Sequence, residues 1–315
     1  MTRYQYYLAP MEGITNATFR RTYHTHFKSM DKYFTPFLCP HTKRDLTTKE
    51  KKEILPENNE GMYVVPQILT NQAEGFLETA GKLEQYGYRE INLNLGCPSK
   101  TVITKGRGSG FLAFPAELRE FLDEIFSKTN LKVSIKTRIG RDDTLLWEEL
   151  LSIYSEFPLE ELIIHPRIQK EFYKGTPHIE AYEAAYRIKN CPICYNGDMF
   201  CKEEIENFWK RFPNTDAMML GRGILRDPCL YEKLFESEEM DASVWKQKVR
   251  SFHDALLDAY IEEMSGDRNV LFKMKELWFY LLESFDGSKQ LIKKLKKSGS
   301  VSEYLRVVEE IFMQD

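Results

Sequence analysis

The stretch EINLNLGCPSKTVITKGRGSG, residues 90–110, opens with alternating polar and apolar residues, the pattern of a β-strand whose two faces differ. Gly-Cys-Pro follows directly, and then comes a glycine-rich segment that carries Lys105 and Arg107. The alternation predicts a strand over residues 90–95. Cys97 is therefore expected just beyond the C-terminal end of that strand.

Similar short runs of β-branched or aromatic residues recur along the first three-quarters of the chain, separated by helix-length segments such as PAELREFLDEIFSK, residues 115–128. Eight strands are predicted, over residues 4–9, 32–38, 62–68, 90–95, 132–137, 161–165, 192–196 and 216–220. Strands that alternate with helices imply a parallel sheet with crossover helices, and eight such units in about 230 residues have the spacing of a (β/α)8 barrel. The predicted fold class is therefore an α/β TIM barrel.

The chain changes character near Met240, where strand patterns stop and helical patterns take over. Three long helical stretches are predicted, over residues 242–266, 269–285 and 301–314. We therefore expect a barrel domain over residues 1–238 and an appended C-terminal helical domain over residues 239–315. Because aromatic residues in helices usually pack, Trp278, Phe279 and Tyr280 are expected in the core of that domain.

The composition is that of an ordinary globular protein, with 42% of the 315 residues hydrophobic and 29% charged. No signal-peptide pattern and no run of about 18 apolar residues occurs, so a cytoplasmic protein with no membrane partner is expected. Six cysteines without a secretory signal indicate reduced thiols. Cys191 and Cys194 form a C-x-x-C pair, typical of a redox dithiol or half a zinc site. Because no second pair completes four ligands, packed thiols and no metal are expected.

The charge pattern leaves RNA open as a partner. A net charge of −4 taken alone argues weakly against nucleic-acid binding. Lysines nevertheless cluster in SKQLIKKLKKSG, residues 288–299, and basic residues also concentrate between Arg20 and Lys52. Such runs more often form solvated faces than binding surfaces, so they do not decide the question.

Polar or glycine residues follow nearly every predicted strand. Active sites of TIM barrels lie at the C-terminal ends of the strands, so these residues are the candidates for a site. They are Ala9, Pro10, Met11, Gln67, Asn94, Cys97, Lys136, Arg138, His165, Arg167, Asn196, Gly197, Asp198, Gly221, Arg222 and Gly223. A single polar strand end is usually structural, but their number indicates an active site.

Six motifs that contain these residues are spread from residue 8 to residue 228. They read LAPMEGITNATFRR (8–21), NLGCPSKTV (94–102), VSIKTRIG (133–140), IIHPR (163–167), YNGD (195–198) and LGRGILRDP (220–228). Together they resemble the tRNA-dihydrouridine synthase family, and Asn-Leu-Gly-Cys-Pro is the most specific of them. The resemblance implies an FMN-binding barrel followed by a helical RNA-binding domain.

The resemblance implies FMN as the cofactor and NADPH or NADH as the hydride donor, and the residue types fit FMN. Gly221 and Arg222 can hold its phosphate through backbone N–H groups and a guanidinium. Lys136 can offset negative charge near N1 of the ring, and Gln67 can bind its pyrimidine edge. The expected cofactor-binding residues are Ala9, Pro10, Met11, Gln67, Lys136, His165, Asn196, Gly197, Asp198, Gly221 and Arg222.

The reaction that the resemblance implies is reduction of the C5=C6 bond of uridine in RNA, with tRNA as the expected substrate. It requires a hydride at C6 and a proton at C5, and a cysteine thiol with a reference pKa of about 8.5 still carries its proton near pH 7. Cys97 is therefore the expected general acid. The loop over residues 98–110 is expected to close over the base, and the expected substrate-binding residues are Asn94, Arg138, Arg167, Lys105 and Arg107.

Two other functions fit part of the pattern. A small-molecule FMN-dependent oxidoreductase of the dihydroorotate-dehydrogenase type could use the same barrel, although it would have little use for a basic helical domain. A non-catalytic RNA-binding protein could keep the barrel as a scaffold, and it would lack a flavin absorption band. The sequence indicates neither the uridine position, nor tRNA against ribosomal RNA, nor the preferred nicotinamide, nor the oligomeric state.

Overall fold

The structure, a computed structural model, describes residues 4–40, 45–285 and 289–313. The chain forms two compact units. The barrel unit comprises residues 1–10, 30–198 and 208–220, and the helical unit comprises residues 11–29, 199–207 and 221–315. The predicted domain boundary between residues 238 and 239 is a single cut in the sequence, whereas each compact unit is built from three segments. The predicted boundary stays a prediction.

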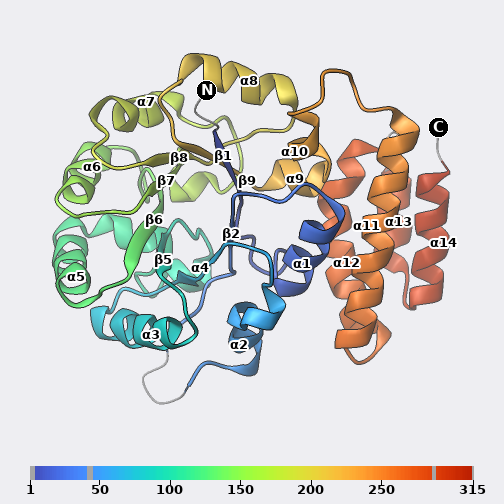
Figure 1. Cartoon of the computed structure of the whole chain (residues 1–315), viewed down its shortest axis with the longest axis horizontal. Helices are drawn as coiled ribbons and strands as arrows, with labels where there is room; N and C mark the ends of the chain where they lie inside the picture. Colours follow the sequence, from blue (N-terminus) through green and yellow to red (C-terminus); the bar gives the residue numbers. More distant parts are fainter. Residues whose placement is uncertain (1–3, 41–44, 286–288, 314–315) are drawn as a thin grey trace. The chain divides into compact units, whose positions relative to one another are not determined.

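The barrel unit contains one fully parallel sheet, in the order β3-β2-β1-β9-β8-β7-β6-β5-β4 (Figure 1). Its strands are β1 (Gln5–Leu8), β2 (Lys32–Phe34), β3 (Val64–Val65), β4 (Gln67–Ile68), β5 (Glu90–Leu95), β6 (Lys132–Arg138), β7 (Leu162–His165), β8 (Ile193–Tyr195) and β9 (Ala217–Leu220). The end strands β3 and β4 are consecutive in the chain, so the sheet curls into a nearly closed barrel. The predicted fold class is confirmed.

The predicted strand over residues 62–68 is split into β3 and β4 at Pro66. Proline has no backbone N–H to give to a ladder, so it interrupts a strand even where its neighbours continue to pair. The carbonyl of Pro66 still accepts the N–H of Asn92 at 2.8 Å. The two short strands therefore occupy one strand position of an eight-position barrel.

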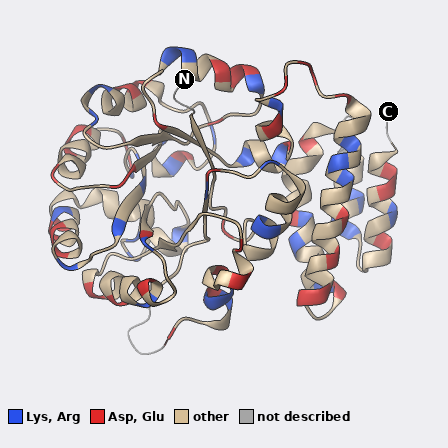
Figure 2. Ribbon diagram, viewed as in Figure 1, with Lys and Arg blue, Asp and Glu red and all other residues tan. Residues whose placement is uncertain are grey.

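Helices on the outside of the barrel bury one face each. They are α2 (Thr48–Ile54), α3 (Ala73–Gln85), α4 (Lys100–Ile103), α5 (Pro115–Lys128), α6 (Trp147–Ser155) and α7 (Ile179–Ile188), with the 3-10 turns η1 (Pro56–Asn58), η2 (Gly108–Ala113) and η3 (Gln169–Glu171). α5 has the predicted bounds, because Pro115 suits a first helical position and the apolar spacing from Leu118 to Ile125 gives one buried stripe. Figure 2 shows acidic and basic residues interspersed on these outer helices.

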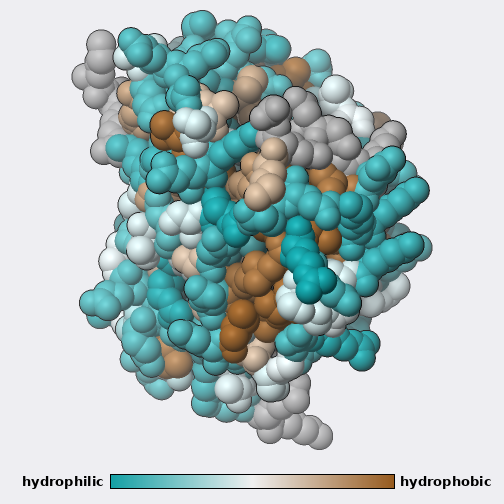
Figure 3. Space-filling model, turned by 90° about the vertical axis from the view of Figure 1, so that its right-hand side faces the viewer, coloured by the Kyte–Doolittle hydropathy of each residue, from teal (hydrophilic) through white to brown (hydrophobic). Residues whose placement is uncertain are grey.

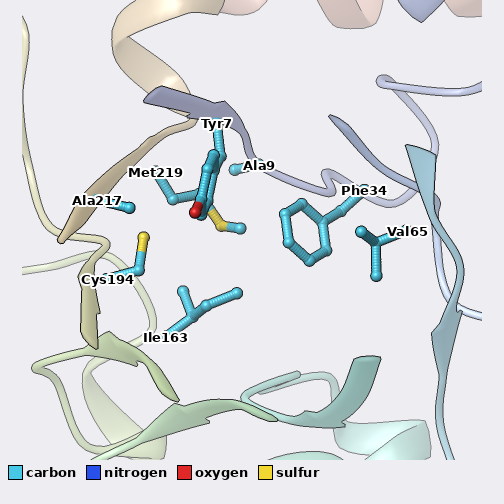
Figure 4. Packing of buried hydrophobic residues seen from close by; sticks show 8 residues of the cluster. All are labelled: Tyr7, Ala9, Phe34, Val65, Ile163, Cys194, Ala217 and Met219. Carbon is cyan, nitrogen blue, oxygen red and sulfur yellow. The ribbon is translucent and has the colours of Figure 1, made fainter. Parts of the chain in front are cut away.

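The barrel interior is packed with apolar side chains up to its C-terminal end. Eight of them form one cluster, shown in Figure 4: Tyr7, Ala9, Phe34, Val65, Ile163, Cys194, Ala217 and Met219. Because side chains alternate between the two faces of a strand, these positions identify the inward-facing residues of β1, β2, β3, β7, β8 and β9. Cys194 belongs to this cluster, in agreement with the prediction of a packed thiol.

The helical unit contains α1 (Ala17–His26), α9 (Arg222–Arg226), α10 (Leu230–Lys233), α11 (Ala242–Glu263), α12 (Asp267–Leu281), η4 (Leu282–Ser284), α13 (Lys289–Lys297) and α14 (Val301–Phe312); α8 (Lys202–Arg211) has residues in both units. Its centre contains Tyr304, whose hydroxyl lies 2.6 Å from both Trp278 Nε1 and His253 Nε2. Trp278 is buried as predicted, but Phe279 is 61% exposed and Tyr280 is only half-buried. The prediction for Phe279 was wrong because it lies about 100° around the helix from Trp278, away from the buried stripe.

The basic N-terminal region contains a buried arginine and a capped helix rather than only a solvated charged surface. Arg20 is completely buried and donates from Nη1 to the carbonyl of Thr15 at 3.0 Å. α2 begins with a capping box in which Thr47 and Glu50 bind each other's backbone N–H groups, which explains a helix in a segment that reads as a charge run.

Among the described residues, none of the helices has the length and apolar character needed to cross a membrane.

Candidate active site

Six residues at the ends of strands share the inward-facing side of the barrel. They form what we call the mouth layer: Ala9, Gln67, Asn94, Lys136, His165 and Asn196. The period of two along each strand directs all of them into the barrel at its C-terminal end. Most other inward positions are apolar, so this layer concentrates the polar chemistry predicted from the sequence.

Asn94 holds the turn that presents Cys97. Its Oδ1 accepts the backbone N–H groups of Gly96 at 3.0 Å and of Cys97 at 2.9 Å, and its Nδ2 donates to Oε1 of Gln67 at 2.6 Å. An asparagine that binds the N–H groups two and three residues ahead fixes a turn at the end of a strand. Cys97 is therefore placed at the mouth of the barrel by a buried side chain, and it is itself half-buried.

The segment after Cys97 is folded onto it. The backbone N–H and the hydroxyl of Ser109 both donate to the carbonyl of Cys97, at 3.2 and 2.7 Å. Gly108 has a φ of +56°, and a β-carbon there would lie 2.9 Å from that same carbonyl oxygen. Only glycine meets both requirements, since other residues strongly disfavour this backbone region. This glycine thus serves close packing beneath the cysteine.

The segment over residues 98–110, which is expected to close over the base, is ordered beside Cys97. α4 and the start of η2 lie in it, and Ser109 is buried. Gly108 and Gly110 both allow backbones to approach closely, and closure over the base stays a prediction. Lys105 is exposed and Arg107 is half-buried, so these two predicted substrate residues remain on the surface of an ordered segment.

Lys136 is the cation of the mouth layer. It follows Ser134 on the inward face of β6 and pairs in register with Asn94 of β5. Burial lowers the pKa of Lys136 to about 8, and the nearby charge of Arg138 acts in the same direction. Within the described residues, its ammonium group has neither an ion pair nor a hydrogen bond. A half-buried cation of this kind is suited to an anionic or electron-rich ligand.

Arg138 and Arg167, predicted as substrate ligands, direct their guanidinium groups at the protein. Arg138 donates to the carbonyls of Gly96, Ile168 and Phe172 at 2.9, 2.9 and 2.7 Å. Arg167 is completely buried, forms a two-pronged pair with Asp198, and donates to the carbonyls of Lys174 and Gly175. Both arginines therefore fasten the loop over residues 168–175, and a direct substrate contact through either guanidinium is not what this structure shows.

This fastened loop presents an aromatic side chain that the sequence analysis missed. Tyr173 is 41% exposed, its ring stacks beside His165 with centroids 6.0 Å apart, and Arg138 lies 5.6 Å from the ring centroid. The preceding Phe172 has a φ of +53°, an uncommon conformation for a bulky residue. Tyr173 lies in a loop without periodicity, so no sequence pattern identified it.

The remaining barrel residues predicted for the cofactor lie at the C-terminal ends of β1, β7 and β8. His165 is buried, with Nε2 at 3.3 Å from Nη1 of Arg167. Asn196 donates from Nδ2 to the carbonyl of Met219 at 2.8 Å. A β-carbon on Gly197 would lie 2.0 Å from the hydroxyl of Tyr195, so this position requires glycine. Asp198 is committed to Arg167, which leaves its backbone rather than its carboxylate for a ligand. Pro10 is half-buried at the end of the same unit's first segment.

The other predicted cofactor residues belong to the helical unit. Met11 is half-buried and its N–H donates to the hydroxyl of Thr15 at 2.7 Å. Gly221 precedes α9, and Arg222 begins that helix with its guanidinium 5.5 Å from the ring centroid of Phe200. A β-carbon on Gly223 would lie 2.0 Å from the carbonyl oxygen of Met199. The backbone at this glycine-rich turn is thus tightly packed.

The polar network also reaches residues that sequence analysis did not single out. Asn92 and Ser134 are completely buried and continue the hydrogen bonds of Gln67 into the barrel. A signal for Asn92 was present, because EINLNL places polar residues at 90, 92 and 94 on one face of a strand that is buried on both. A run of polar residues on a buried face indicates a network rather than a surface.

Comparison with known proteins gives one consistent family. The sequence matches the family model described as Dihydrouridine synthase (Dus) over residues 7–314. A "Probable tRNA-dihydrouridine synthase" of Staphylococcus aureus (strain COL) is 27% identical over 98% of this chain and 93% of its own length. "tRNA-dihydrouridine synthase B" of Pasteurella multocida (strain Pm70) is 28% identical over 82% of this chain and 76% of its own length.

Proposed function

Because the chain belongs to the dihydrouridine synthase family, its reaction is the flavin-dependent reduction of uridine in tRNA, and we propose that FMN is the flavin, that NADPH or NADH reduces it, and that Cys97 is the general acid. The observation that carries this proposal is the placement of Cys97 by Asn94 at a barrel mouth that also holds the half-buried cation of Lys136.

The mouth layer fits the isoalloxazine of FMN. A flavin ring needs hydrogen-bond donors along its pyrimidine edge and a cation near N1, where charge gathers on reduction. Gln67 and Lys136 supply these groups, and Ala9 and Pro10 offer small apolar surface for the remainder of the ring. Bound FMN would supply the hydride that reduces C6 of uracil. His165, Asn196, Gly197 and Asp198 are proposed to line the cofactor on the β7 and β8 side.

The phosphate of FMN is proposed to bind the glycine-rich turn before α9. Gly221 and Gly223 lack side chains that would cover the backbone N–H groups, and Arg222 adds a guanidinium that can bind two phosphate oxygens. Met11, of the same unit, stays a predicted cofactor-binding residue. These assignments rest on residue chemistry and on the family.

Cys97 is proposed to deliver the proton to C5. The turn made by Asn94 and the two hydrogen bonds from Ser109 hold the backbone on both sides of the cysteine, so its thiol has a restricted position. Restricting the acid in this way is what makes a proton transfer efficient. Arg138 and Arg167 are proposed to contribute indirectly, by holding the loop that carries Tyr173, and Tyr173 offers a ring for stacking against the base or the flavin.

The helical unit is proposed to bind the RNA. A groove between α12 and α13 is lined by Phe272, Phe279, Ile292, Leu295, Lys275 and Lys296, and Phe272 and Phe279 are 62% and 61% exposed. Figure 3 shows a band of apolar surface flanked by long hydrophilic side chains. Exposed aromatic rings beside lysines suit single-stranded or splayed nucleotides, since bases stack on the rings and phosphates bind the cations. Lys105 and Arg107 are proposed to contact the RNA near the barrel mouth.

The lysines of α13 give this part of the proposal a test. Lys293, Lys296 and Lys297 are exposed, while Lys294 pairs with Glu310 of α14; the side chain of Lys289 lies outside the described residues. Changing all five lysines to glutamine is expected to raise the KM for tRNA. The slope of log KM against log salt concentration should fall by about 2 to 4, because each lost phosphate contact reduces this slope by about 0.9.

The control is a second variant that loses the same number of positive charges at five other positions. Arg119, Lys128, Lys132, Lys189 and Lys210 are all exposed residues of the barrel unit outside residues 20–52 and 168–175, and their replacement by glutamine is expected to leave the salt slope nearly unchanged. NADPH oxidation without RNA should be the same in both variants. Equal salt slopes in the two variants would show that the lysines of α13 are a solvated surface.

The function as a whole is tested by reconstitution. Purified protein is expected to show a flavin absorption band and to form dihydrouridine in uridine-containing tRNA when NADPH or NADH is added, as measured by nucleoside mass spectrometry. Protein that binds FMN and reduces it but leaves tRNA unchanged would contradict the assigned substrate. RNA from cells with and without the gene would locate the modified uridine.

A further inference from the structure

Two completely buried residues that have no part in the mechanism above are connected to it by hydrogen bonds. Asn92 of β5 lies in register between Gln67 of β4 and Ser134 of β6. Gln67 Nε2 donates to Asn92 Oδ1 at 2.8 Å, and Asn92 Nδ2 donates to Ser134 Oγ at 2.9 Å. With Asn94, these side chains form a continuous polar chain across three strands, which we call the amide relay: Asn94, Gln67, Asn92 and Ser134.

The direction of the amide relay is set by the backbone. The N–H groups of Gly96 and Cys97 can only donate, so the Asn94 atom that they bind must be the carbonyl oxygen. The Asn94 amide nitrogen is then the atom 2.6 Å from Gln67, which must present its own oxygen. Gln67 therefore donates to Asn92, Asn92 donates to Ser134, and the Ser134 hydroxyl completes the chain at the carbonyl of Ile91, 3.3 Å away.

Counting donors and acceptors shows what this direction leaves for a ligand. Oδ1 of Asn94 accepts two N–H groups, which uses both of its lone pairs, while Nδ2 uses one of two hydrogens. Nε2 of Gln67 likewise uses one hydrogen, on Asn92. Among the described residues, nothing accepts the second hydrogen of either amide. Asn94 can therefore offer a ligand a donor but no acceptor.

We propose that Asn92 and Ser134 are positioning residues that support the Gln67 amide in the hydrogen-bonding direction that the backbone sets through Asn94, so that the barrel mouth presents N–H groups to the flavin and to the base. This inference rests on the proposed function for the identity of both ligands. It limits the contact of Asn94 to a carbonyl oxygen of uracil, because a base N–H would find no free acceptor on this side chain. The Gly96 and Cys97 N–H groups fix the amide of Asn94, and the contact with Asn92 supports the amide of Gln67.

The relay itself is tested in the protein without flavin, by a double-mutant cycle. Asn92→Leu and Ser134→Ala both break the Asn92–Ser134 bond, so their effects on the free energy of unfolding in urea should not add. If the two effects were independent, the folding equilibrium constant of the double variant would fall by the product of the two single-variant factors. We expect it to be about fivefold higher than that value, the coupling typical of contacting residues. Thr137→Val is the matched control, since Thr137 is equally buried on β6 but bonds Tyr154 on the outer face. Asn92→Leu and Thr137→Val should be additive.

The direction is tested by a conservative replacement, with the dissociation constant of FMN as the measurement. Residue 92 must accept a hydrogen bond from Gln67 in this direction, and an aspartate can do so while the hydroxyl of Ser134 turns to donate to it. Asn92→Leu is expected to weaken FMN binding about tenfold, the value of one well-placed hydrogen bond. Asn92→Asp should recover affinity to within about threefold of the unmodified protein, and Thr137→Val should leave it unchanged.

The outcomes separate this inference from the proposed function. If Asn92→Asp binds FMN as weakly as Asn92→Leu, the relay does not run in the assigned direction. If Thr137→Val weakens FMN as much as Asn92→Leu, the effect is one of general packing and Asn92 is not a positioning residue. Additive unfolding energies for Asn92→Leu and Ser134→Ala would remove the relay altogether. Failure of the unmodified protein to bind FMN would overturn the cofactor assignment and the positioning role with it, while the cycle would still decide whether the relay exists.

Discussion

Replacing Cys97 with alanine is expected to lower the rate of dihydrouridine formation by about 10²- to 10⁴-fold, the range that a positioned general acid contributes. FMN binding and the reduction of FMN by NADPH should remain close to those of the unmodified protein. The thiol is needed only when C5 of uracil takes up its proton, so the half-reaction that reduces the flavin does not involve it. The two half-reactions are measured separately, by flavin absorbance without RNA and by single-turnover reduction of tRNA.

A matched cysteine distinguishes chemistry from packing. Cys191 is half-buried in the barrel unit like Cys97, but it lies just before β8, at the end of the barrel opposite the mouth. Cys191→Ala should leave both half-reactions unchanged. Cys97→Ser should fall between the alanine variant and the unmodified protein, because a hydroxyl can occupy the position but is a much weaker acid. If Cys97→Ala reduces tRNA at the unmodified rate, another group protonates C5.

Much of the barrel could be predicted because its strands follow a short, local pattern. The alternation in EINLNL and the polar residue after each apolar run depend only on neighbours in the chain, and they gave the strand positions and the mouth layer. The same locality explains α5, whose bounds follow from Pro115 and one apolar stripe. Cys97 was found in this way because its Gly-Cys-Pro context comes directly after a strand.

What could not be predicted depends on contacts between distant residues. The guanidinium groups of Arg138 and Arg167 bind carbonyls from a loop that begins after β7, and nothing in VSIKTRIG or IIHPR indicates those partners. The packing of Gly108 beneath the carbonyl of Cys97 likewise depends on a contact that the sequence pattern does not indicate. Phe279 was predicted to be buried, but it lies one position after Trp278 and faces away from the buried stripe of α12. Each of these arrangements depends on how elements pack in three dimensions.

Lys136→Met is expected to lower the midpoint potential of the bound flavin by about 30 to 60 mV, which corresponds to a tenfold to hundredfold loss of affinity for reduced relative to oxidised FMN. The cation stabilises the form of the ring that carries more negative charge, so its removal affects the reduced state most. Arg222→Ala is the comparison, since a phosphate contact is the same in both oxidation states. It should weaken oxidised and reduced FMN equally and leave the potential unchanged.

The pKa of Lys136 gives this prediction a second, independent measurement. Burial, aided by Arg138, lowers this pKa to about 8 from an unfolded value of about 10.5. Below about pH 8 the folded protein must hold a charged amine in a poor environment, so the free energy of unfolding without flavin should rise as the pH increases from about 8 to about 10.5. Affinity for reduced FMN should change in the opposite sense over the same range, because binding then requires proton uptake, with at most a tenfold loss for each pH unit. Lys136→Met should abolish both trends and Arg222→Ala neither, so a pH dependence that survives in the methionine variant would assign the cation beside the flavin to another residue.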